Sequence, residues 1–205
     1  MKKTYSLVTV FILFQILTIY TVKAQVEGGA GFTGYKYLSG GIGRPLAVGL
    51  NLNADVEVNK KAKILLSASF FLPVTYNYNK TINDTGVPVV THEQLTNVQL
   101  TALYVGYLIG NNVGGGFYVG IGPSVIFYNS TLTRDNYKNY NYSGAFKDYL
   151  LDGRAGVEIP MGLLRLFAEV DAAPKIFTDF KSNNVSYSPN TGTIFSGTVG
   201  LRIRI

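Results

Sequence analysis

The strongest constraint on the fold is an alternation of apolar and polar residues that continues far beyond the length of an ordinary strand. From Leu46 to Val58 every second residue is apolar, and the intervening positions are mainly Asn, Asp, Glu and Gly. A period of two places the two sets on opposite faces of a β-strand. Strands of globular proteins average about 5 to 6 residues, so the pattern predicts unusually long strands.

The same pattern recurs along the chain, and each repeat is long enough to supply the ~9 to 11 tilted residues with which a strand crosses a bilayer. The pattern therefore predicts an all-β fold, an eight-stranded antiparallel up-and-down transmembrane β-barrel. The eight segments are approximately 26–37, 46–58, 63–78, 96–109, 116–129, 147–159, 163–174 and 192–205.

The connections between these segments alternate in length. Barrels of outer membranes have short periplasmic turns at one end and longer extracellular loops at the other, and the alternation predicts this topology. The turn-like connections are 59–62, 110–115 and 160–162, the long polar ones are 79–95, 130–146 and 175–191, and a shorter outer loop is expected at 38–45. Glycine clusters such as Gly114-Gly115-Gly116 are interpreted as tight turns, because they do not fit a phosphate-binding motif.

The N-terminus predicts export. Lys2 and Lys3 precede an apolar stretch from Leu7 to Tyr20, and Ala24 closes a tripeptide of the kind that signal peptidase accepts. Residues 1–24 are therefore expected to be a signal peptide. The alternative, a retained membrane anchor, is disfavoured because the stretch is shorter than the ~20 residues of a spanning helix.

The remaining domain, residues 25–205, is nearly neutral. The signal segment carries three of the 18 basic residues and no acid, so the net charge of +6 falls to 15 minus 12, or +3. This excess does not suggest a nucleic-acid partner. The chain has no cysteine and one histidine, so no disulfide framework, metal or cofactor is expected.

Alternation alone does not exclude a soluble, periplasmic lipocalin-like barrel that binds a small ligand, because such a barrel also has one apolar face on each strand. The polar faces favour the membrane barrel, since they are rich in Gly, Ser, Thr and Asn. Charges on these faces would satisfy one another inside a narrow lumen, and we expect Glu27 to lie near Arg202 or Arg204. The predicted lumen charge cluster comprises Glu27, Arg154, Glu158, Arg165, Glu169, Asp171, Arg202 and Arg204.

Aromatic residues gather near the ends of the segments, where membrane barrels carry interfacial girdles. Ordinary β-propensity is the alternative explanation. The expected loop-end girdle contains Tyr35, Tyr37, Tyr76, Tyr78, Phe127, Tyr128, Tyr149 and Phe195, and the turn-end girdle contains Tyr104, Tyr107, Phe117 and Tyr118.

Three stretches resemble a known family. Residues 117–124 (FYVGIGPS) look like the Tyr-x-Gly-x-Gly-Pro strand of small outer-membrane β-barrel domain proteins, a group that includes OmpA/OmpX-like and PorT-like members. Residues 152–169 look like the next hairpin of that family, and residues 198–205 resemble its terminal strand. The chain departs from the family at Ile205, where an aromatic residue is frequent. The resemblance implies a bacterial outer-membrane location and, for PorT-like members, an association with a secretion or envelope assembly.

An eight-stranded barrel has an interior just wide enough for side chains, so a diffusion pore is not expected. The chain is therefore predicted to be a non-enzymatic integral outer-membrane protein of a Gram-negative cell, with a structural or interaction role. A lipid A-modifying enzyme is the minor alternative, and it would need a serine near His92, which is placed in the second outer loop. That loop histidine lacks the second histidine of a zinc-binding motif.

The third outer loop has the composition of an adaptable recognition surface, with tyrosine, asparagine and positive charge. A solvated loop that keeps the barrel end in water is the alternative interpretation. The expected partners are membrane lipids including lipopolysaccharide, with a protein partner or a surface glycan bound through the extracellular loops. The candidate recognition residues are Arg134, Tyr137, Lys138, Tyr140 and Tyr142.

Overall fold

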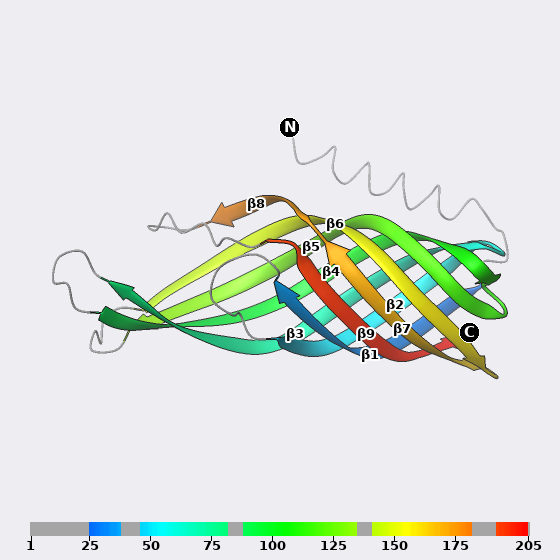
Figure 1. The fold of residues 1–205 in the computed structure, drawn as a ribbon, viewed down its shortest axis with the longest axis horizontal. Helices are drawn as coiled ribbons and strands as arrows, with labels where there is room; N and C mark the ends of the chain where they lie inside the picture. The colour runs from blue at the N-terminus through cyan, green and yellow to red at the C-terminus, as the bar shows by residue number, and fades with distance from the viewer. Residues whose placement is uncertain (1–24, 38–45, 82–87, 135–140, 182–191, 205) are drawn as a thin grey trace, which may run out of the picture.

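The computed structural model describes residues 25–37, 46–81, 88–134, 141–181 and 192–204, and it forms an elongated barrel (Figure 1). The predicted signal peptide, residues 1–24, and the predicted outer loop 38–45 lie outside the described residues. In the described part of the chain, no helix is long and apolar enough to cross a membrane. The strands are β1 (Val26–Tyr37), β2 (Ala47–Asn59), β3 (Ala62–Thr81), β4 (Pro88–Asn111), β5 (Gly115–Arg134), β6 (Asn141–Met161), β7 (Leu164–Ala173), β8 (Lys175–Lys181) and β9 (Ile194–Arg204).

The strands form one closed antiparallel ring, which confirms the predicted fold. Each strand from β1 to β7 pairs with its neighbour in sequence, and β9 closes the ring between β7 and β1. Strands β7 and β8 are two parts of one barrel stave, because both pair with β6 and only Pro174 separates them. Proline has no N–H to donate to a ladder, and the stave breaks at this residue.

The two faces of each strand differ in polarity, with the polar face inside. On β2, Asn51, Asn53 and Asp55 are buried, whereas Leu50 and Leu52 between them are 55% and 54% exposed. Exposed large apolar side chains occur on every strand of the ring. A lipocalin-like barrel has the opposite orientation, with its apolar face inward, so the soluble alternative does not match this arrangement.

The three short connections form tight turns at one end of the barrel, which we call the turn end. Residues 60–61, 112–114 and 162–163 make the turns. Gly110, Gly115 and Gly162 adopt positive φ angles of 88°, 69° and 71°, a conformation that a side chain disfavours. The turn interpretation of the 114–116 glycine cluster is therefore confirmed.

The long connections are shorter than predicted, because the strands continue through most of them. Strand β3 continues to Thr81 and β4 already begins at Pro88. Strand β5 continues to Arg134 and β6 already begins at Asn141. Strand β8 occupies residues 175–181. In contrast, β1 ends at Tyr37 and β9 begins at Ile194. Five strands (β3, β4, β5, β6 and β8) thus project beyond the closed ring as a curved sheet, the loop-end wall, at the left of Figure 1.

The height of this wall follows from strand geometry. Phe71 is the last residue of β3 that pairs with β2, and β3 continues ten residues further, to Thr81. A rise of about 3.3 Å per residue and a tilt of about 40° place the tip roughly 25 Å above the closed ring. The wall is therefore comparable in height to the hydrophobic belt of a membrane barrel.

Candidate functional site

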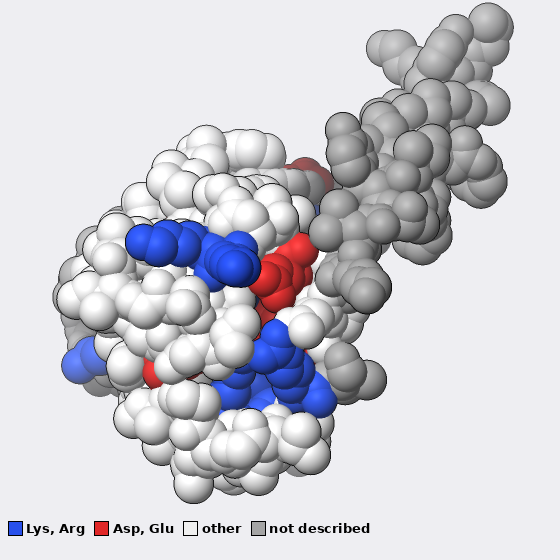
Figure 2. All heavy atoms as spheres, turned by 90° about the vertical axis from the view of Figure 1, so that its right-hand side faces the viewer, with Lys and Arg blue, Asp and Glu red and all other residues white. Residues whose placement is uncertain are grey.

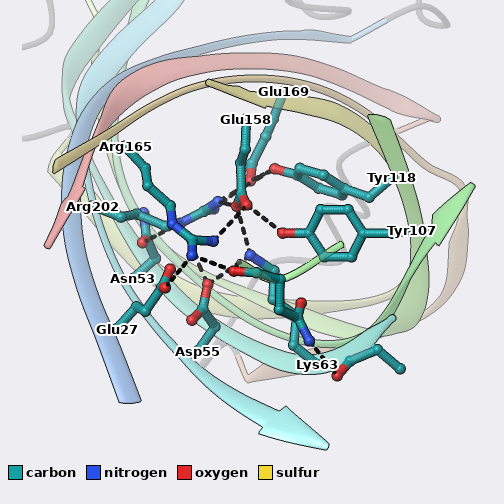
Figure 3. A network of polar contacts seen from close by, with 12 residues as sticks. Glu27, Asn53, Asp55, Lys63, Tyr107, Tyr118, Glu158, Arg165, Glu169 and Arg202 are labelled. Atoms are coloured by element: carbon teal, nitrogen blue, oxygen red, sulfur yellow. Dashed lines mark hydrogen bonds and ion pairs between the residues drawn. The ribbon is translucent and has the colours of Figure 1, made fainter. Parts of the chain in front are cut away.

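The most highly connected polar site lies inside the turn-end half of the barrel (Figure 3). Glu158 on β6 is its centre. Its Oε1 is 2.5 Å from Lys63 Nζ and also accepts a hydrogen bond from Arg202. Its Oε2 accepts a hydrogen bond from Tyr107 and lies 3.4 Å from Arg165 Nη1. Four strands besides β6 therefore place a side chain on one carboxylate.

Arg202 on β9 connects Glu158 with side chains on β2 and β7. Its Nη2 lies 2.5 Å from Glu169 Oε1, and its Nε donates to Asn53 Oδ1 over 3.0 Å. The guanidinium group also stacks over Phe167 at 4.1 Å from the ring centroid, a favourable cation–π arrangement. Arg202 is completely buried, so these contacts replace its hydration.

A second group of charges continues the network toward the middle of the lumen. Arg154 Nη1 lies 2.9 Å from Glu169 Oε2, and Arg154 Nε pairs with Asp171. Tyr118 donates its hydroxyl proton to Glu169 over 2.5 Å. Ser196 Oγ donates to Asp171 over 3.0 Å. The ion pairs thus form a continuous chain across β6, β7 and β9.

The network reaches solvent at the turn end. Arg165 Nη2 lies 3.0 Å from Glu27 Oε1, and Lys63 Nζ lies 2.8 Å from Asp55 Oδ2. Glu27 is opposite Arg204 in the β1–β9 register, and Arg204 is half-buried. Figure 2 views this end, where acidic and basic side chains meet near the mouth and most of the surrounding surface is uncharged.

Above these ion pairs, the lumen contains a layer of amide and hydroxyl side chains and then a largely apolar layer, and the buried Asp152 and Asp148 of β6 lie at these levels. Asn51 donates to Ser69 over 2.8 Å, and Gln99 donates to Ser124 over 2.9 Å. The apolar layer faces the loop end, and it combines stacked and edge-on aromatic rings with aliphatic side chains. Its members are Tyr35, Ala47, Phe71, Leu95, Ile126, Tyr128, Phe146, Leu150, Ala173 and Ile194.

The predicted lumen residues lie together inside the barrel. Seven of the eight are buried, and Arg204 is half-buried at the mouth. Glu27 lies opposite Arg204 in the register, as expected, but its ion pair is with Arg165. Sequence reasoning missed Asp55 and Lys63, which supply two further charges of the network. Residue parity places both on the inward faces of β2 and β3, which is the signal that could have found them.

The predicted girdles are wrong at four positions. Tyr35, Tyr107, Tyr118 and Tyr128 point inward and are buried, although they lie at the predicted ends of the barrel. The remaining described members face outward. These are Tyr104, Phe117, Phe127, Tyr149 and Phe195, and the side chains of Tyr37, Tyr76 and Tyr78 lie outside the described part of the chain.

His92 lies in strand β4 and not in a loop as predicted. Its register partners are Asn77 and Thr133, so neither strand places a serine directly opposite it. Of the recognition residues, Arg134 is the last residue of β5 and Tyr142 the second of β6. Tyr137, Lys138 and Tyr140 lie outside the described residues.

Comparisons with known proteins show the same fold without close sequence similarity. No family model matches the chain, and no curated protein matches it significantly. The outer membrane protein OprG from Pseudomonas aeruginosa has a TM-score of 0.56 at 13% identity, over 89% of this chain and 96% of its own.

Two further barrels are similar to a comparable extent. A major outer membrane protein from Thermus thermophilus has a TM-score of 0.51 at 11% identity, over 87% of this chain and 99% of its own. The third barrel is Ail, the attachment invasion locus protein of Yersinia pestis, solved with the heparin analogue sucrose octasulfate. It has a TM-score of 0.50 at 11% identity, over 89% of this chain and 97% of its own. At such identities the likeness establishes the barrel fold.

Proposed function

We propose that the protein is a non-enzymatic integral barrel of a Gram-negative outer membrane that interacts with partners through its loop-end wall. The observation that carries the membrane location is the inverted polarity of the barrel. Its buried charges face the lumen, and large apolar side chains are exposed on every strand. Soluble monomers rarely expose apolar patches of more than a few hundred Å², whereas lipid favours such a surface.

A diffusion pore is disfavoured by the layered lumen. Ion-paired side chains fill its turn-end half, and aromatic rings pack across its loop-end half. The lipid A-modifying alternative is disfavoured because the register neighbours of His92 are asparagine and threonine. The resemblance to OmpA/OmpX-like and PorT-like proteins, and an association with an envelope or secretion assembly, remain predictions from the sequence.

The loop-end wall is the part of the barrel best suited to a partner. It extends roughly 25 Å beyond the ring, and its described side chains include the half-buried Lys147 and Lys175. Ail, which shares the fold, was solved with a sulfated heparin analogue. An anionic surface glycan is therefore the first ligand that we propose for the wall.

Cysteine labelling tests the membrane location. Leu50→Cys, on the exposed apolar face, should react in purified outer membranes with a lipid-soluble maleimide and resist a water-soluble one. Thr131→Cys, exposed on the wall, should show the opposite preference. Fast labelling of Leu50→Cys by the water-soluble reagent, with the protein in the soluble periplasmic fraction, would exclude the membrane location.

Glycan binding is tested separately with the purified barrel in detergent and sucrose octasulfate as the probe. The double variant Lys147→Gln/Lys175→Gln should bind about tenfold more weakly, because two surface ion pairs of about 0.7 kcal/mol each are lost. Lys60→Gln/Lys61→Gln, at the turn end, is the matched control and should bind like the wild type. Equal affinity of all three proteins would reject the wall as the glycan site.

A further inference from the structure

A groove of about 730 Å³ crosses the outer face of the barrel from β2 to β6. Alanine side chains hollow it, since Ala54, Ala68 and Ala102 lie among larger apolar residues on neighbouring strands. The register sets each of them against a leucine, and Ala68 is opposite both Leu52 and Leu100. Because this face of a membrane barrel meets acyl chains, a lipid chain is the occupant that these surroundings supply.

The groove is long enough for a whole acyl chain. One row of register partners runs along it from Leu52 on β2, through β3, β4 and β5, to Tyr149 on β6. The row crosses four strand spacings of about 4.8 Å, which makes roughly 19 Å. One leaflet of the hydrocarbon core is about 15 Å deep. An extended chain in the groove therefore reaches through the leaflet at an incline.

The groove climbs toward the loop end of the barrel. Leu52 lies seven residues before the last residue of β2, whereas Tyr149 lies twelve residues before the last residue of β6. With a rise of about 3.3 Å per residue and a tilt of about 40°, Tyr149 is roughly 13 Å closer to the loop end. The same geometry places Tyr149 about 30 Å above the turn end, which equals the thickness of the hydrocarbon core.

A lysine lies just beyond the upper end of the groove. Lys147 is two residues from Tyr149 on the outer face of β6, and it is half-buried. Its Nζ lies 5.2 Å from the ring centroid of Phe127, and Tyr149 stacks on Phe177 with 4.3 Å between the centroids. Aromatic rings of this kind are enriched at the level of the lipid headgroups. The lysine is thus placed where the headgroup of a lipid in the groove would lie.

From the groove and this lysine we propose that the barrel binds lipid A, the phosphorylated glycolipid of the outer leaflet, with an acyl chain in the groove and a phosphate on Lys147. Lysine binds phosphate as a point charge. The exposed Asp179 is opposite Lys147 in the β6–β8 register, and its carboxylate opposes the phosphate. The inference rests on the proposed function, because Lys147 is one of the two cations assigned to an anionic glycan, and it adds the acyl part of that ligand.

The test titrates the full-length barrel, purified in an uncharged detergent, with lipid A and follows the complex by native mass spectrometry. The wild type should bind lipid A, and it should bind dephosphorylated lipid A about threefold more weakly. Ala102→Leu fills the groove and should lose the bound lipid A. Ala168→Leu makes the same change at an exposed position of another groove on the outer face, and as the matched control it should bind like the wild type.

Two charge variants decide the matter even where Ala102→Leu does not fold. Lys147→Gln should bind lipid A about threefold more weakly, and Asp179→Asn about twofold more tightly. The proposal is overturned by a wild type that binds no lipid A, or by equal affinity of the wild type, Lys147→Gln and Ala102→Leu. Sucrose octasulfate binding that persists in that case would leave the glycan function intact, whereas lipid A binding without octasulfate binding would reject the glycan function alone.

Discussion

Glu158→Gln is the sharpest test of the lumen network, because it removes one charge and keeps the shape of the side chain. Lys63 and Arg202 share Glu158 Oε1, and Arg165 faces Oε2. Removing one partner of a buried ion pair costs about 3 to 5 kcal/mol. Since Asp55 still pairs with Lys63, we expect the lower end of this range, about 3 kcal/mol.

The assay is urea unfolding of the barrel in lipid vesicles, followed by gel mobility. With a slope of about 2 kcal/mol per molar urea, the unfolding midpoint should fall by roughly 1.5 M. Glu57→Gln, at a half-buried position of β2, is the matched control and should cost less than about 1 kcal/mol. If both variants shift the midpoint equally, the network is not held by Glu158.

A double variant separates the lost charge from other effects of the substitution. Lys63→Met/Glu158→Gln removes the cation together with its carboxylate partner. The losses of unfolding free energy in the single variants Lys63→Met and Glu158→Gln should therefore sum to more than the loss in the double variant, by about 1 to 3 kcal/mol. Additive costs would mean that Lys63 and Glu158 do not interact in the folded barrel.

Three further outcomes are expected. Gly200→Ala should destabilise the barrel by about 1 to 3 kcal/mol in the same urea assay, because its Cβ would overlap the carbonyl oxygen of Ala30, whereas Gly144→Ala has open space and should be nearly neutral. Liposomes containing the wild type should exclude small sugars in a swelling assay, and Arg202→Ser should raise their permeability; a freely permeable wild type would contradict the filled lumen. His92→Ala should leave the lipid A mass spectrum of an expressing strain unchanged, and a changed spectrum would revive the enzymatic alternative.

The membrane-spanning part of the fold was predictable because its two faces meet different surroundings. Leu50 and Asn51 on β2 face an apolar exterior and a polar lumen, so their alternation is visible in the sequence. In the loop-end wall, residues 88–95 of β4 (PVVTHEQL) do not alternate between apolar and polar side chains. These residues were therefore predicted as part of the long loop 79–95, although their backbone pairs with β3.

The lumen was predictable only where it is polar. Arg202 and Glu169 stand out as charges on alternating positions, whereas the inward face of β4 near the turn end is Leu103, Val105 and Tyr107. The rule that polar residues face inward would place these three residues on the outer face of the barrel. For this reason Tyr107 was predicted to lie in the turn-end girdle. Lys63 was missed because it follows the two lysines of a turn, and composition does not distinguish a turn lysine from a lumen lysine.

Arg202 lies on β9, the strand that closes the ring, so its contacts form only when the barrel closes. Its side chain reaches Asn53 on β2, Glu158 on β6 and Glu169 on β7, but only when β9 lies between β7 and β1. In an unclosed sheet the two glutamates lack this shared arginine, and their charges repel each other and the neighbouring acids. Closing the last seam brings this arginine to both carboxylates in the same step, so a barrel in which β9 is not yet paired is less stable than the closed one.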